Sequence, residues 1–223
     1  MMIVAIDGPA GAGKGAIAKM ISERLGFTRI DTGAMYRCVT LKMIRLNIGL
    51  SEIDKIKDLL EHTDIRLSIE DDILKVYLDG EDVTKEIRTP EVNDFVSPVS
   101  AIKEIRIKMV DLQRNMKNYA KDIVMEGRDI TTVVFPDADF KFYLTASSEK
   151  RAERRLKEMQ EAGVEITYEE VLNSIVARDK KDMEKEMGAL MVAKDAIIID
   201  NTEMDLEETF EAFKKEIEKS RGE

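Results

Sequence analysis

A short apolar run that leads without a break into a glycine-rich loop and then a helical pattern constrains this chain most. The run is Ile3–Asp7, and the loop reads Gly8-Pro9-Ala10-Gly11-Ala12-Gly13-Lys14-Gly15. The loop matches the G-x-x-x-x-G-K part of a P-loop, in the context of strand, loop and helix that the motif requires. Glycines let backbone N–H groups surround a phosphate, and the lysine reaches the β- and γ-phosphates of a nucleotide. The segment therefore predicts a phosphate-binding loop, with a glycine-rich turn that holds no ligand as the alternative.

The position after Lys14 departs from the general P-loop pattern. Many P-loop proteins have Ser or Thr there, and its hydroxyl ligates Mg²⁺. This chain has Gly15 followed by Ala16. We therefore expect that no side chain ligates a metal directly and that any Mg²⁺ is held through phosphates and water. A nucleotide-binding protein with weakened catalysis is the alternative that this departure leaves open.

Five short apolar runs separated by helical patterns predict an α/β fold, a parallel sheet covered by helices on both faces. The runs are Ile3–Asp7, Phe27–Asp31, Ile123–Glu126, Phe140–Leu144 and Ala196–Asp200. The helix after the first run is expected to end at Gly26, because glycine commonly follows the last helical residue. Its predicted buried face contains Ile17, Ala18, Ile21 and Leu25. A second core-facing helix near the C-terminus is predicted to bury Leu206, Phe210, Phe213 and Ile217.

Two segments interrupt this alternation. Between residues 65 and 84, apolar and polar residues alternate around Glu70-Asp71-Asp72 and Asp79-Gly80, which predicts a small antiparallel meander with turns at both places. The second segment, residues 148–191, is predicted to be helical, with Ser148 as one helix cap and a capping box from Thr167 to Glu170. We expect a core of residues 1–36, 115–147 and 192–223, a region with the β insert at 37–114, and the helical segment at 148–191.

Composition narrows the classes of function. The chain has 35 Lys and Arg against 45 Asp and Glu, a net charge of −10, which argues against broad binding to nucleic acid. No apolar run is long enough to cross a bilayer, and the first residues lack the basic start of a signal peptide. The single cysteine, Cys38, excludes an internal disulfide and fits a reducing cytoplasm. We expect Cys38 to be buried and His62, the single histidine, to be a solvated surface residue.

Two further motifs follow predicted strands. Asp31-Thr32-Gly33-Ala34-Met35-Tyr36-Arg37 comes after the second strand, and Glu126-Gly127-Arg128-Asp129 after the third. Ligands of open α/β sheets gather at the carboxyl ends of the strands, so both motifs are expected to face the phosphate loop. Each motif brings an arginine, whose bidentate guanidinium suits a second phosphate.

Six motifs in chain order resemble those of bacterial cytidylate kinases. They are GPAGAGKG, DTGAMYR, GEDVTKEIRTPEV, EGRD with VVFPDA, SSEKRAERR and RDKKD. The resemblance covers essentially the whole chain, and the meander at 65–84 is similar to the insert of this family. It implies a P-loop kinase with a five-stranded parallel sheet that phosphorylates CMP and dCMP with ATP and Mg²⁺. It further implies a monophosphate-binding region at 37–114, a mobile lid with arginines at 148–191, and a cytoplasmic monomer whose partners are small nucleotides rather than nucleic acid or membrane.

The same resemblance implies roles for individual residues. The ATP-binding residues would be Gly8, Pro9, Ala10, Gly11, Ala12, Gly13, Lys14, Gly15 and Ala16. The catalytic residues would be Lys14, Arg154 and Arg155, with Arg151 in the same lid segment. Thr32, Arg106, Asp129 and Lys185 would lie near the base, and Ser97, Arg178 and Asp182 near the sugar and phosphate. The acceptor phosphate would be held by Arg37 and Arg128.

The residues leave alternatives open beside this resemblance. Arg178, Asp182 and Lys185 share one face of a helix at i, i+4 and i+7, which also suits a solvated ladder of ion pairs. The arginines at 151–155 could equally be surface charges. The chain also departs from the family pattern at Ala10, Ala16, Thr131 and Lys185. A lysine at 185 keeps the charge but lacks the planar fork of arginine, so recognition of the base could loosen there. A P-loop kinase for AMP, UMP or shikimate remains an alternative.

Overall fold

The computed structural model describes residues 1–70, 73–118 and 121–219. A five-stranded sheet is formed by β1 (Ile3–Asp7), β2 (Thr28–Asp31), β6 (Ile123–Gly127), β7 (Phe140–Thr145) and β8 (Ile197–Asp200). The strand order is β2-β6-β1-β7-β8, and β1 pairs in parallel with both β6 and β7. The five predicted strands are thus confirmed, each end within one residue of its predicted place.

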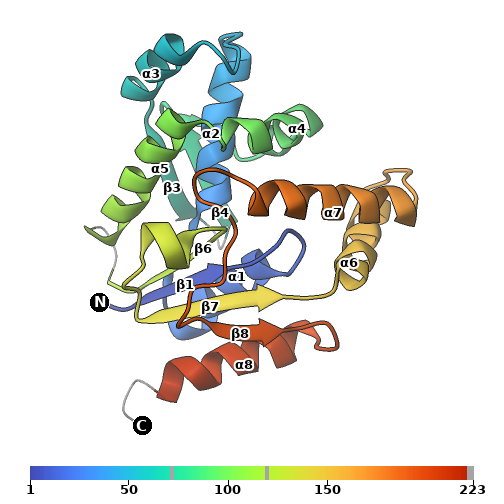
Figure 1. The fold of residues 1–223 in the computed structure, drawn as a ribbon. Coiled ribbons are helices and arrows are strands. Elements are labelled where there is room, and N and C mark those ends of the chain that lie inside the picture. Colours follow the sequence, from blue (N-terminus) through green and yellow to red (C-terminus); the bar gives the residue numbers. More distant parts are fainter. Residues whose placement is uncertain (71–72, 119–120, 220–223) are drawn as a thin grey trace. The chain divides into compact units, whose positions relative to one another are not determined.

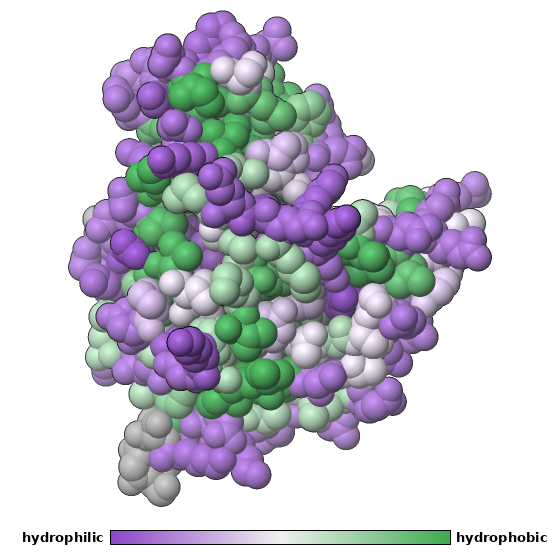
Figure 2. All heavy atoms as spheres, in the orientation of Figure 1, coloured by the Kyte–Doolittle hydropathy of each residue, from purple (hydrophilic) through white to green (hydrophobic). Residues whose placement is uncertain are grey.

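The chain divides into two compact units, and β2 spans their boundary. One unit consists of Met1–Arg29 and Lys117–Glu223, and the other of Ile30–Met116. Among the described helices, none is both long and apolar enough to cross a membrane. Polar and charged side chains cover much of the face that Figure 2 shows, as the charged fraction of 36% leads one to expect.

The core of the first unit lies between the sheet and two helices, α1 (Lys14–Leu25) and α8 (Leu206–Lys219) (Figure 1). Phe142 of β7 and Phe213 of α8 meet there with ring centroids 4.4 Å apart. Every residue of β1 is buried, so both faces of this central strand are covered. Gly26 ends α1 as predicted, with a left-handed φ of 77°.

The predicted apolar stripe of α8 is confirmed except at its first position. Phe210, Phe213 and Ile217 are buried, but Leu206 is 48% exposed. Leu206 is the first residue of the helix, and the packed part of the stripe begins one turn later.

Two helices, α6 (Ser148–Glu161) and α7 (Tyr168–Met183), form the predicted helical segment. They pack on each other around Ala152, Val171 and Ile175. The predicted capping box from Thr167 to Glu170 is present at the start of α7. The predicted cap of α6 was wrong by one residue. The Ser147 hydroxyl accepts a hydrogen bond from the Lys150 amide, and Ser148 is already helical.

The second unit contains the predicted antiparallel meander. Its strands β3 (Ile65–Glu70), β4 (Ile73–Leu78) and β5 (Glu81–Asp82) pair in chain order. Asp79 and Gly80 have left-handed φ values of 51° and 87°, as a tight hairpin turn requires. The other predicted turn, Glu70-Asp71-Asp72, includes residues 71–72, which lie outside the described residues.

In its described residues, the second unit also contains four helices and a short turn. They are α2 (Thr32–Arg45), α3 (Ile53–Glu61), α4 (Pro90–Val99) and α5 (Lys103–Asn115), with a short 3₁₀ turn η1 at Glu86–Arg88. Cys38 is buried in α2, where desolvation raises the pKa of its thiol to about 12. His62 is exposed just after α3. Both residues are where the sequence placed them.

Candidate functional site

The glycine-rich loop joins β1 to α1, and two of its positions favour glycine over residues with a side chain. A Cβ atom on Gly8 would lie 2.0 Å from the carbonyl oxygen of Leu144. Gly13, the residue before α1, has a left-handed φ of 94°. The loop can therefore turn sharply while its backbone stays open to a ligand.

Lys14 is the most constrained charge in this loop. Only 5% of the residue is exposed, and its Nζ donates hydrogen bonds of 2.8 Å to the carbonyl oxygens of both Gly8 and Pro9. Burial and then the positive charge of Arg128 lower the pKa of Lys14 to about 7. An ammonium held by two carbonyl dipoles and opposed by a second cation is suited to an anionic ligand.

Residue 15 lies close to two charged side chains. A Cβ atom there would lie 2.9 Å from Glu126 Oε1 and 3.3 Å from a terminal nitrogen of Arg29. Glu126 and Arg29 lie 3.4 Å apart, and both side chains are largely buried. A carboxylate thus occupies the space beside the first turn of α1 that a larger residue 15 would need.

The sequence analysis predicted no functional role for Asp7, but the structure shows its side chain as a buried hydrogen-bond acceptor. It is fully buried at the end of β1 and accepts hydrogen bonds from the Ile130 amide (2.9 Å), the Thr131 amide (2.7 Å) and the Thr131 hydroxyl (2.6 Å). Burial raises the pKa of Asp7 to about 6 even though these bonds oppose the rise. A polar residue at the end of an otherwise apolar strand was the signal in the sequence.

A compact ion cluster joins α7 to the end of β6. Asp182 Oδ2 lies 2.7 Å from Arg128 Nε, and Asp182 Oδ1 lies 2.9 Å from Lys185 Nζ. Although burial opposes ionisation, the charges of Arg128 and Lys185 hold the pKa of Asp182 at about 2. Asp182 is only 3% exposed and the Lys185 side chain only 10%, so the alternative of a solvated ladder is wrong for these two residues.

The predicted helical face is also wrong at one member. The helix ends at Met183, so Lys185 reaches Asp182 from the segment that follows it. Arg178 lies on the helix and remains accessible to solvent. Partial desolvation of its guanidinium and then the charge of Arg128 lower the pKa of Arg178. Two arginines that repel each other are held close to the same ion cluster.

Arg151 is a buried anchor rather than a surface charge. It donates 3.0 Å hydrogen bonds to the carbonyl oxygens of Ala146 and Ala10, and it pairs with Asp179 at 2.7 Å. The start of α6 is therefore tied both to the phosphate loop and to α7.

The other two lid arginines differ from each other. Arg154 donates to the side-chain and backbone oxygens of Asn201 at 3.1 and 2.7 Å, and Asn201 in turn donates to the carbonyl of Ala12. Arg155 is an exposed residue paired with Glu158 at 2.9 Å. Arg154 is thus linked through Asn201 to the phosphate loop, whereas Arg155 projects to solvent.

Four further predicted site residues lie in the second unit. Thr32 is buried at the first position of α2, and Arg37 on the same helix donates to Asn93 of α4. Arg106 of α5 is buried, with its guanidinium 5.8 Å from the ring centre of Tyr36. Ser97 is half-buried on α4. Arg37 thus contacts α4, whereas Tyr36 of the same helix lies near Arg106 of α5.

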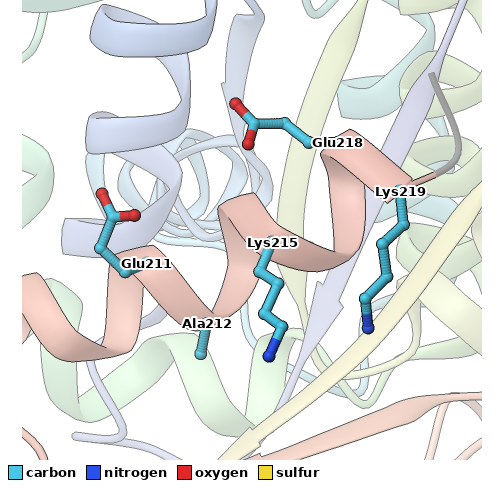
Figure 3. A pocket seen from close by; sticks show the side chains of 5 residues that line it. All are labelled: Glu211, Ala212, Lys215, Glu218 and Lys219. Carbon is cyan, nitrogen blue, oxygen red and sulfur yellow. The ribbon is translucent and has the colours of Figure 1, made fainter. Parts of the chain in front are cut away.

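A surface hollow on α8 has no connection with these groups. Its lining residues all come from this helix (Figure 3), and they are Glu211, Ala212, Lys215, Glu218 and Lys219. None of these residues belongs to the predicted site, so the hollow and the site are separate.

Comparison with known proteins points to one family. The family model described as cytidylate kinase matches residues 4–219. The cytidylate kinase of Caldicellulosiruptor saccharolyticus is 48% identical over 93% of this chain and 92% of its own. That of Caldanaerobacter subterraneus subsp. tengcongensis is 48% identical over 97% and 95%. That of Fusobacterium nucleatum is 44% identical over 98% of each chain.

Solved structures resemble the fold at low sequence identity. An uncharacterised protein from Eubacterium ventriosum matches with a TM-score of 0.54 and 14% identity, over 98% of this chain and 99% of that one. The protein TT1252 from Thermus thermophilus matches with a TM-score of 0.51 and 16% identity, over 98% and 97%. These two likenesses concern the fold alone.

Proposed function

The chain belongs to the cytidylate kinase family, and on this premise we propose that it transfers the terminal phosphoryl group of ATP to CMP and dCMP, yielding CDP and dCDP. The observation that carries the proposal is the crowding of cations around the phosphate loop. Burial and then the charge of Arg128 lower the pKa of both Lys14 and Arg178. A phosphate group bound among these three cations would relieve their repulsion. Phosphoryl transfer requires such cations, because they neutralise the charge of the transferred group.

The reaction needs no general base, because an oxygen of the acceptor monophosphate is already an anion at neutral pH. Catalysis would come from positioning the two substrates and from neutralising charge. In this proposal Lys14 contacts the β- and γ-phosphates of ATP, which the backbone of Gly8–Ala16 surrounds. Arg37 and Arg128 hold the acceptor phosphate, with Ser97, Arg178 and Asp182 near its sugar and phosphate.

Recognition of the base would fall to residues with complementary donors and acceptors. Cytosine presents an amino donor and two acceptors on its pairing edge. Asp129 and Thr32 can accept from the amino group, while Arg106 and Lys185 can donate to the acceptors. The buried position of Thr32, Arg106 and Asp129 supports this assignment, because a discriminating site must exclude water.

Magnesium fits the residues beside the phosphate loop. Among the described residues, no group of three or more His, Cys, Asp or Glu could hold a metal, and positions 15 and 16 carry no hydroxyl. The Glu126 carboxylate beside the first turn of α1 is a hard oxygen donor of the kind that suits the water shell of Mg²⁺. Mg²⁺ bound with ATP would neutralise part of the charge of its phosphates.

The parts of the chain would divide the work. Residues 37–114 would bind the monophosphate, residues 148–191 would close over the transfer site as a lid with Arg154 and Arg155, and the rest would hold ATP. Closure would exclude water and so limit wasteful hydrolysis of ATP. We further propose that the protein acts as a cytoplasmic monomer on small nucleotides, without nucleic acid or membrane partners.

The function is tested by measuring ADP release with CMP, dCMP, UMP, AMP and GMP as acceptors. We expect CMP and dCMP to be preferred, and preference for another acceptor would overturn the proposal. A protein that binds ATP yet phosphorylates none of them would be the weakened nucleotide-binding protein that Gly15 and Ala16 left open.

Replacing Lys14 by alanine tests the role of the loop. We expect Lys14→Ala to lower kcat by at least about a hundredfold, because the lysine stabilises charge that develops during transfer, while CMP binding measured by calorimetry changes little. Lys19→Ala is the matched control, since Lys19 is an exposed lysine of the same helix that pairs with Glu23. An active Lys14→Ala enzyme would contradict the assigned role.

A further inference from the structure

The backbone of Asp7 connects the phosphate loop with the segment that follows β6. It is the last residue of β1, and Gly8, the first residue of the phosphate loop, follows it directly. In the parallel pairing of β1 with β6, Asp7 lies opposite Gly127. The residues after Gly127 are Arg128 and Asp129, the pair that the proposed function assigns to the acceptor.

The side chain of Asp7 holds the far end of the same segment. Its two carboxylate oxygens accept three hydrogen bonds from Ile130 and Thr131, at 2.6 to 2.9 Å. Arg128 and Asp129 are therefore a two-residue span held on both sides by one residue. Strand pairing holds Gly127 before the span, and the carboxylate holds Ile130 and Thr131 after it.

The turn after the span depends on these contacts. Ile130–Val134 forms a single wide turn in which the Asp129 carbonyl accepts from the Val133 and Val134 amides. The Ile130 and Thr131 amides open this turn and donate to Asp7. A buried amide without an acceptor is costly, so loss of the carboxylate contacts would shift the turn.

Thr131 contributes its side chain to this arrangement as well as its amide. The residue is 2% exposed, and its hydroxyl supplies one of the three hydrogen bonds to Asp7. It also opposes the rise in the pKa of Asp7 that burial causes. A glycine could supply only the backbone donor.

We propose that Asp7 and Thr131 form a positioning pair, which holds Arg128 and Asp129 in the geometry that the acceptor monophosphate requires. The role rests on the proposed function, since the acceptor is what these two residues are held to meet. Neither Asp7 nor Thr131 touches the reacting atoms in this role. Each acts through the backbone of the span between them.

The test compares three variants with the wild type at matched stability. Thr131→Val removes the hydroxyl while keeping the shape, Thr131→Ser restores it, and Thr132→Val is the control, because Thr132 is the partly exposed neighbour. We expect Thr131→Val to raise the KM for CMP about tenfold, the factor expected when a hydrogen bond to a charged group is lost, and the KM for ATP by less than about twofold. Thr131→Ser and Thr132→Val should stay within about twofold of the wild type.

Hydrogen exchange gives a second readout that does not depend on the reaction. The Ile130 and Thr131 amides should exchange about tenfold faster in Thr131→Val than in the wild type, and Thr131→Ser should restore their protection. Equal changes in the KM for CMP and ATP, or unchanged exchange of these amides, would overturn the positioning pair.

The same assays separate this inference from the proposed function. A wild type that prefers another monophosphate contradicts the proposed function alone, and the pair is then judged by the KM for that acceptor. A wild type that phosphorylates no acceptor contradicts both.

Discussion

At the scale of single residues, burial shifts the pKa values of ionisable groups in the site. Lys14 is held by the carbonyls of Gly8 and Pro9, and its pKa is lowered to about 7 by burial and by Arg128. Burial and the neighbouring charge thus weaken the preference of this lysine for its charged form. Phosphates of ATP would favour its charged form and raise that pKa again.

ATP binding should consequently take up protons. At about pH 8 we expect a fraction of a proton to be bound per ATP, because the lysine is mostly neutral before binding and charged afterwards. Calorimetry in two buffers of different ionisation enthalpy measures this uptake directly. A binding enthalpy that does not depend on the buffer would contradict it, and Lys14→Met should abolish the dependence.

At the scale of elements, α6 begins from a well-defined base. Arg151, in its first turn, bonds to the carbonyl of Ala10 in the phosphate loop and pairs with Asp179 of α7. Ser147 caps the helix by accepting from the Lys150 amide. The proposed lid is therefore anchored at the end that carries its arginines.

The cap can be tested separately from the chemistry. Ser147→Ala should lower the free energy of unfolding by about 1 kcal/mol, because an amide at the start of α6 loses its acceptor. Ser148→Ala, one residue later, should change it much less, because Ser147 and not Ser148 caps the helix. Urea unfolding measures the free energy of unfolding of both variants. An equal loss in the two would contradict the assignment of the cap to Ser147.

At the scale of the whole molecule, two buried groups set opposite trends of stability with pH. The pKa of Asp7 is raised from 3.8 to about 6, so the folded state binds its proton more tightly than the unfolded state does. Stability from this group falls as pH rises from about 4 to about 6. The pKa of Lys14 is lowered from 10.5 to about 7, so stability from this group rises as pH increases between those values.

Asp7→Asn should remove the first trend. The raised pKa corresponds to about 3 kcal/mol between the two ends of its pH range. The free energy of unfolding of the wild type should therefore fall relative to that of Asp7→Asn by an amount of this order between about pH 4 and 6. Unfolding in urea at several pH values measures the slope, and parallel curves for the two proteins would contradict the role of Asp7.

The sequence predicted what depends on local pattern. Strand ends were correct to within one residue because each apolar run is bounded by turn or helix residues, and the capping box at Thr167 was correct because its residues lie within one helical turn. Of two adjacent serines, both able to cap α6, the pattern favoured the wrong one. Periodicity likewise extended the stripe of α8 to Leu206 and a helical face to Lys185, since it carries no information on where packing or the helix stops.

What the sequence could not predict depends on residues far apart in the chain. The bonds from Thr131 to Asp7 and the anchoring of Arg151 on Ala10 arise only when the strands have assembled. The roles of the individual site residues remain predictions that the proposed assays test.

The carboxylate of Glu126 beside Gly15 also bears on how such sequences are compared. Residue 15 and residue 126 share one volume at the start of α1, so their identities are not independent variables. A hydroxyl-bearing residue at position 15 would therefore require the Glu126 carboxylate to shift. Comparing the loop residues alone leaves out this neighbour from β6.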